Sequence, residues 1–179
     1  KAMAVYDSFV REQTLNRKIQ SATKIHSNDM TFANIGGALI LIDYYGADPD
    51  LVVPASVDGK AVISIHPDAI SGKFLDSRTR KVKRGLRNDA SLRSISNYSS
   101  KSLADGITSI QLPNTLKSLF GQVFAKCDNL EILVIPASVR HMTNDVVEKS
   151  GIKQIYFNGP IPPNFDVNKF DGEVYAKVG

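Results

Sequence analysis

An apolar pattern that recurs after 23 residues constrains this chain of 179 residues more than any other feature. The first copy reads Ile107-x-x-Ile110-x-Leu112-Pro113-x-x-Leu116-x-x-Leu119. The second copy keeps the same spacing and reads Leu130-x-x-Leu133-x-Ile135-Pro136-x-x-Val139-x-x-Met142. Repeats of about 20 to 50 residues are typical of solenoids, in which each unit covers the apolar side of its neighbour. The pattern therefore predicts stacked laps.

Each copy predicts a short strand followed by a turn. Ile110 and Leu112 lie two residues apart, so a strand points both side chains inward and Gln111 outward. Pro113 has no N–H to donate and ends the strand. The three-residue spacing of Leu116 and Leu119 favours an irregular or 3₁₀-like turn. We expect parallel neighbouring strands at 109–112, 132–135 and 154–157, and eight buried side chains: Ile110, Leu112, Leu116, Leu119, Leu133, Ile135, Val139 and Met142.

Weaker copies extend the repeat in both directions. Leu51-Val52-Val53-Pro54 matches the strand and its proline, and residues 65–70 match the second half of a lap. Residues 85–95 keep part of another lap, and Ile152-x-x-Ile155-x-Phe157 opens a last one. The expected fold is a β-rich α/β solenoid of about four to five laps.

The repeat resembles the BspA-like, or Treponema pallidum-type, leucine-rich repeat, whose pattern is L-x-x-I-x-I-P-x-x-V-x-x-I-G-x-x-A-F-x-x-C. Residues 107–127 and 130–147 carry the matching positions, and the resemblance spans roughly residues 36–178, with a poor fit over 73–106. It implies a leucine-rich repeat protein of bacterial cell surfaces or secretions. A role in binding a host or microbial protein or glycan, as an adhesin does, is what this resemblance implies.

The first 35 residues have a different pattern. Apolar residues recur at spacings of three and four, as in an amphipathic helix or two short ones: Met3, Tyr6, Val10, Leu15, Ile19 and Ala22. We expect a helical cap over 1–35 and a leucine-rich repeat domain over 36–179, irregular at 73–106. A cap would cover the apolar end of the first lap. The alternative is a helix that docks on a partner protein.

The positive charge is concentrated in one segment. The formal net charge is +4, and residues 78–87 hold six of the 22 basic residues. This run fits a solvated loop, or contacts to a polyanion such as a sulphated glycan through Arg78, Arg80, Lys81, Lys83, Arg84 and Arg87. It contains no aromatic residue for base stacking, so specific nucleic-acid recognition is not expected. No apolar run reaches the ~18 residues of a membrane span.

No catalytic or cofactor motif is recognisable, and we expect neither an enzyme nor a bound cofactor. His26, His66 and His141 are scattered, and His66 stands in the repeat position of Phe120 and Thr143, which favours a structural role. Cys127 is the single cysteine and occupies the position of Ser150, which favours a small buried side chain over a reactive thiol. Asp43, Asp48 and Asp50 fit either calcium ligands or ordinary turn chemistry, and we expect no metal site there.

The outward side of the strands is the candidate binding surface. The alternation points one set of side chains away from the core: Val52, Gln111, Ile132, Val134, Gln154 and Tyr156. Several of these are apolar or aromatic, as interface anchors are. The alternative is that the N-terminal segment or a neighbouring chain covers them. Two functions therefore stay open: an interaction module for a protein or glycan, and a spacer that presents another domain.

Overall fold

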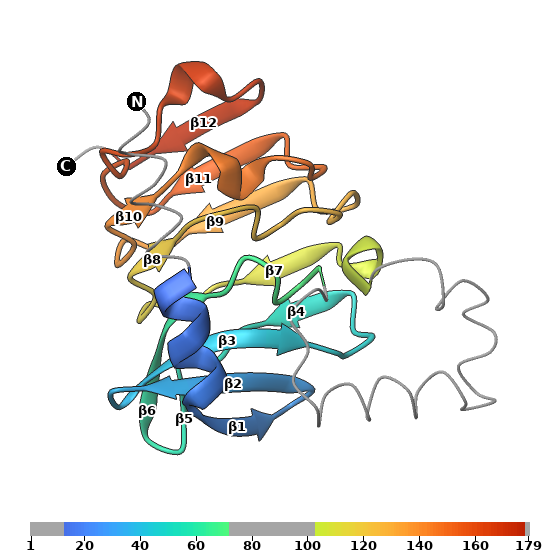
Figure 1. Ribbon diagram of the computed structural model, residues 1–179. Helices are drawn as coiled ribbons and strands as arrows, with labels where there is room; N and C mark the ends of the chain where they lie inside the picture. Colours follow the sequence, from blue (N-terminus) through green and yellow to red (C-terminus); the bar gives the residue numbers. More distant parts are fainter. Residues whose placement is uncertain (1–12, 72–102, 178–179) are drawn as a thin grey trace, which may run out of the picture.

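The computed structural model describes residues 13–71 and 103–177, which wind into a solenoid of about five laps (Figure 1). The basic run at 78–87 and the partial copy at 85–95 lie outside the described residues, as do Met3, Tyr6 and Val10. The strands climb from the N-terminal hairpins at one end of the stack to the last strand at the other. The predicted leucine-rich repeat solenoid is confirmed.

One side of the solenoid carries two parallel ladders. The strands are β4 (Asp50–Val52), β7 (Ser109–Gln111), β9 (Ile132–Ile135), β11 (Gln154–Phe157) and β12 (Glu173–Ala176). The predicted pairing of 132–135 with 154–157 is confirmed, and β12 adds to the far edge of β11. β7 lies beside β9, as predicted, but it ends at Gln111 and its ladder is with β4. Val53 N–H donates to the Gln111 carbonyl at 3.0 Å, which extends the β4–β7 contact beyond the strands.

A second sheet forms the other side. Its strands are β1 (Thr23–Ser27), β2 (Met30–Ile35), β3 (Ala38–Tyr44), β5 (Ser56–Val57), β6 (Lys60–Ile65), β8 (Ser118–Leu119) and β10 (His141–Met142). Strands β3, β6, β8 and β10 are parallel neighbours. The expected 3₁₀-like backbone at Leu116 and Leu119 is therefore wrong at Leu119. Leu116 N–H closes a turn on the Pro113 carbonyl, and the chain then extends into β8. Two apolar residues that lie three positions apart fit both a 3₁₀-like turn and a turn that leads into a strand.

Short 3₁₀ segments form corners of the laps. They are η2 (Leu103–Gly106), η3 (Asn144–Val147) and η4 (Val167–Lys169). Val146 and Val147 of η3 are buried. The Asn144 amide joins two laps, because its Nδ2 donates to the Asp166 carbonyl and its Oδ1 accepts from the Asp166 N–H, both at 2.8 Å.

The core is one continuous apolar column through the laps. Seven of the eight side chains predicted to be buried are buried, and Ile110 is half-buried but packs against the same cluster. At the C-terminal end, Phe165 contacts Phe157 and Phe170 and covers the last lap, with ring centroids 5.5 and 6.4 Å apart. Burial of this kind stabilises by about 25 cal/mol per Å² of apolar surface, so the stacked laps hold together mainly through these contacts.

The N-terminal end is closed by hairpins and a helix. A helix occupies residues 13–21, and Ile19 packs against Ala33, Ile40 and Ile42. A helical cap over all of 1–35 is wrong, because 23–35 form β1 and β2; the boundary at 35/36 stays a prediction. The physical reason is a two-residue hairpin turn, in which Asn28 and Asp29 have φ of 47° and 61°.

Gly151 fixes how closely two laps approach. Its N–H donates to the Cys127 carbonyl, and a Cβ at this position would lie 2.1 Å from the Asp128 carbonyl oxygen.

Backbone cannot yield as a flexible side chain does, so Gly151→Ala should lower the free energy of unfolding by about 1–3 kcal/mol or more. Gly106→Ala is the matched control, because a Cβ there meets nothing within 4 Å. Urea unfolding measures both, and equal stabilities of the two variants would contradict this account.

Candidate binding face

Two columns of outward side chains run across the laps and define what we call the outward face. The first column is Asp50, Ser109, Ile132, Gln154 and Glu173, and the second is Val52, Gln111, Val134, Tyr156 and Tyr175. The register of the ladders aligns each column within β4–β7 and within β9–β11–β12, and β7 lies beside β9. All six predicted face residues belong to these columns.

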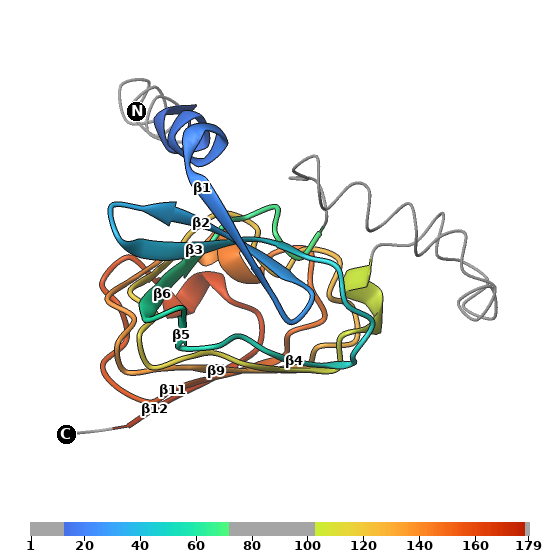
Figure 2. The ribbon, with the colours of Figure 1, turned by 90° about the horizontal axis from the view of Figure 1, so that it is seen from below.

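The apolar members of the outward face remain accessible. The exposed fractions are 53% for Val52, 51% for Ile132, 41% for Val134 and 36% for Tyr156. The helix over residues 13–21 lies against β2 and β3, on the opposite side of the solenoid (Figure 2). The described part of the N-terminal segment, residues 13–35, therefore does not cover this face.

Polar groups near the edges of the face are held by hydrogen bonds between neighbouring strands. The Ser109 hydroxyl donates to Asp50 Oδ1 at 2.5 Å, which joins the first column between β4 and β7. Gln154 Nε2 donates to Glu173 Oε2 at 3.3 Å and joins the same column between β11 and β12. Lys153 and Glu131 form an exposed ion pair at 2.9 Å, which contributes little stability at the surface.

Two tyrosines form the aromatic end of the face. The rings of Tyr156 and Tyr175 stack with centroids 4.7 Å apart and planes 12° apart. The Tyr175 hydroxyl donates to Glu173, and this hydrogen bond raises the pKa of Tyr175 above its ordinary value of 10.0. Tyr175 and Glu173 were missed from the sequence because β12 departs from the repeat spacing. The alternation Glu173-Val174-Tyr175-Ala176 is the signal that could have found them.

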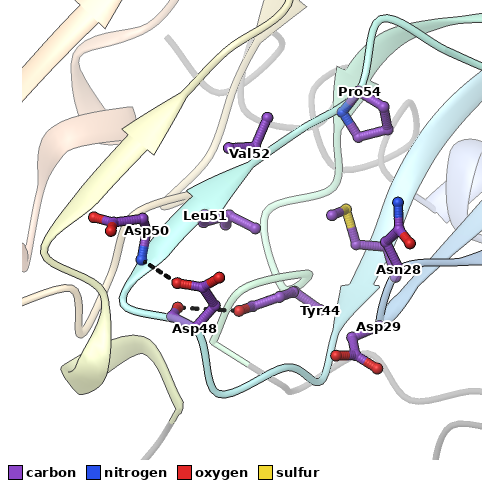
Figure 3. Close-up of a pocket in the computed structure, with 9 residues that line it drawn as sticks. Asn28, Asp29, Tyr44, Asp48, Asp50, Leu51, Val52 and Pro54 are labelled. Atoms are coloured by element: carbon purple, nitrogen blue, oxygen red, sulfur yellow. Dashed lines mark hydrogen bonds between the residues drawn. The ribbon is translucent and has the colours of Figure 1, made fainter.

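A cavity of about 360 Å³ lies beside the free edge of β4 (Figure 3). Met30, Tyr44 and Leu51 give it an apolar lining, and Asp29, Asp48 and Asp50 also line it. Asp48 Oδ1 accepts from the Asp50 N–H at 2.9 Å, and the Tyr44 hydroxyl donates to the Asp48 carbonyl at 3.2 Å. These contacts are the turn chemistry that was the alternative to calcium binding.

The described residues do not bring metal ligands together. Asp43 is buried on β3, whereas Asp48 and Asp50 are exposed. Within residues 13–71 and 103–177, no three His, Cys, Asp or Glu side chains are close enough to hold a metal ion. In the same ranges, no helix has the length and apolar character that crossing a membrane requires.

Cys127 is buried in the core. Burial, with smaller contributions from Asp128 and Asp105, raises the pKa of the thiol to about 12. A thiol with this pKa is almost entirely protonated at neutral pH, which matches the expected structural role in the repeat. His141 lies exposed on β10.

His66 fastens the N-terminal helix to the first lap. The Asp68 N–H donates to His66 Nδ1 at 3.1 Å, so the ring proton belongs on Nε2, which lies 2.8 Å from Asn16 Oδ1. Burial lowers the pKa of His66 below its ordinary value of 6.5, although Asp68 raises it in part. The neutral ring is thus the form that fits this position, as the structural interpretation of His66 requires.

This geometry makes stability depend on pH. Because the pKa of His66 is lower in the folded state, the unfolded chain takes up a proton first as the pH falls through 6.5. The free energy of unfolding should therefore decrease from pH 7.5 to pH 5.5 and level off below the folded-state pKa. His66→Gln, measured by urea unfolding at both pH values, should reduce this decrease, whereas His141→Gln should retain it. An unchanged pH dependence in His66→Gln would contradict the assignment.

Comparisons with known proteins give one family match and two similar solved structures. A family model described as BspA type leucine rich repeat region matches residues 84–172 with six copies. Among curated proteins, none matches the chain. The crystal structure of a leucine-rich repeat protein from Bacteroides capillosus ATCC 29799 is 19% identical, with a TM-score of 0.48, over 76% of this chain and 99% of that one. The T. pallidum leucine-rich repeat protein is 13% identical, with a TM-score of 0.33, over 75% of this chain and 71% of that one. The six matched copies show that residues 84–172 of the chain belong to the BspA-type leucine-rich repeat family.

Proposed function

We propose that this chain is a non-catalytic interaction module that binds a host or microbial protein through its outward face, as an adhesin does. Leucine-rich repeat solenoids are protein-interaction modules in general, and this chain has that architecture. The observation that carries the proposal is the exposure of Val52, Ile132, Val134 and Tyr156 in aligned columns. An apolar patch with a tyrosine is the usual composition of an interface anchor.

An extracellular or cell-surface location belongs to the same proposal. Its support is the BspA-type family, whose members are often surface-associated. A glycan partner fits the same location. The basic residues of 78–87, Arg78, Arg80, Lys81, Lys83, Arg84 and Arg87, stay predicted polyanion contacts. Glycan binding through them would weaken steeply with salt, because each neutralised charge releases a counterion.

A structural spacer without its own ligand is the second candidate function. The regular stack of laps would serve to present another domain, and the uncharged apolar side chains of the outward face would then contact nothing. If the chain is a spacer, substitutions on the outward face should change neither binding to a partner nor the stability of the fold. The two functions therefore differ in one measurable property of the face.

A matched pair of variants tests the proposal. The purified chain is screened against extracellular matrix proteins and glycans. The affinity for any partner that is found is then measured for the Val134→Glu and Val167→Glu variants. Both valines are about equally exposed, at 41% and 40%, but Val167 lies on η4, outside the face. Val134→Glu should weaken binding about tenfold or more, as at an interface hot spot, with thermal stability unchanged. Equal binding by both variants would contradict the proposal, and a screen without any partner would favour the spacer.

A further inference from the structure

The Tyr156–Tyr175 stack has one ring face that is not used within the described part of the chain. β12 is the outer strand in the order β12-β11-β9, so one face of the Tyr175 ring lies against Tyr156 and the other points away from the ladder. Tyr175 is 44% exposed. The electron-rich face of an aromatic ring attracts cations and planar groups.

Glu173 holds a carboxylate beside this ring. Residues 173 and 175 are two apart on β12 and therefore point to the same side. Glu173 Oε2 accepts from the Tyr175 hydroxyl and from Gln154 Nε2. Among the described residues, Glu173 Oε1 has no hydrogen-bond donor. The two bonds on Oε2 restrain the carboxylate, so Oε1 can accept from a ligand with little further ordering cost.

The charges of the outward face favour a cationic ligand. Its two columns contain the carboxylates of Asp50 and Glu173 and no lysine or arginine, and Lys177, which is exposed, follows β12 two residues beyond Tyr175 and outside the columns. Lys153, which precedes β11, is paired with Glu131. A surface with unpaired negative charge beside apolar side chains attracts a positive group and repels an acidic one.

We propose that Tyr175 and Glu173 form the anchor site for an arginine side chain of the protein partner, a proposal that rests on the proposed function of the outward face. A planar guanidinium can stack on the free face of Tyr175 while it donates to Glu173 Oε1. A lysine ammonium lacks the plane and stacks less well. A neutral sugar could stack on the ring but would gain nothing from the carboxylate charge.

The experiment uses the full 179-residue chain and a defined probe. The probe is an acetylated and amidated hexapeptide in which arginine alternates with glycine. Its control is the same peptide with citrulline, which keeps the shape of arginine without its charge. Binding is followed by NMR through the amide signals of β11 and β12. The arginine peptide should shift these signals saturably, more strongly than a lysine peptide, and the shifts should weaken as salt is added. The citrulline peptide should leave them nearly unchanged.

Three variants assign the site. Glu173→Gln and Tyr175→Leu should each weaken binding of the arginine peptide roughly three- to tenfold, the range for a surface charge pair or cation–π contact. Glu148→Gln is the matched control: Glu148 is also exposed and accepts from a glutamine amide, Gln122 Nε2, at 3.2 Å, but it lies outside the two columns of the outward face. This control should bind as the unmodified chain does. Equal loss in Glu148→Gln, no binding of the arginine peptide, or preferred binding of a neutral hexasaccharide would overturn the proposal.

The outcomes separate this proposal from the proposed function. If the arginine peptide does not bind while Val134→Glu still abolishes binding of a protein partner, the arginine anchor is wrong and the interaction module stands. If the peptide binds at Glu173 while no protein partner responds to Val134→Glu, the anchor stands and the proposed use of the outward face fails.

Discussion

Apolar contact between successive laps is the interaction on which this structure depends. A single lap contributes only a few inward side chains, such as Leu133, Ile135, Val139 and Met142 from one copy of the repeat. Without the next lap, one side of each of these side chains would face water. Stacking buries them and places main-chain groups of adjacent laps within hydrogen-bonding distance, as between Gly151 and Cys127. Lap length is therefore constrained by packing rather than by any local conformational preference.

The same alternation that builds the core creates the outward face. Each outward residue of β9 and β11 is followed by an inward one, so the burial pattern along both strands alternates. Outward side chains contribute little to the core, so the core does not restrict their chemistry.

The two ends of the stack have no neighbouring lap and are covered in other ways. The N-terminal end uses the β1–β3 hairpins and the helix, tied by His66 to Asn16, and the C-terminal end uses Phe165.

The repeat could be predicted from the sequence because its signal is periodic and each copy supports the others. The same applies to the six predicted face residues, which follow from the alternation. The second sheet could not be predicted from the sequence. Two-residue strands such as Ser118–Leu119 are too short to show an alternating pattern, and they form only where a neighbouring lap supplies a strand to pair with. The hairpins β1–β2, β2–β3 and β5–β6 did have local signals in Asn28-Asp29, Gly36-Gly37 and Asp58-Gly59, all with positive φ. The apolar spacing of the residues before them is typical of a helix, and it led to the prediction of a helical cap over 1–35.

The direction of the interlap hydrogen bonds has a mechanical consequence. On both sides of the solenoid the strands lie across the stack, so the bonds between them point along its axis (Figure 1). A force that pulls the two ends apart loads these bonds one lap at a time instead of shearing them together. The solenoid would lengthen stepwise, each lap releasing roughly 75–80 Å of extended chain. A protein held between two surfaces could thus yield under tension and rewind when the tension falls, because each lap needs only its neighbour as a template.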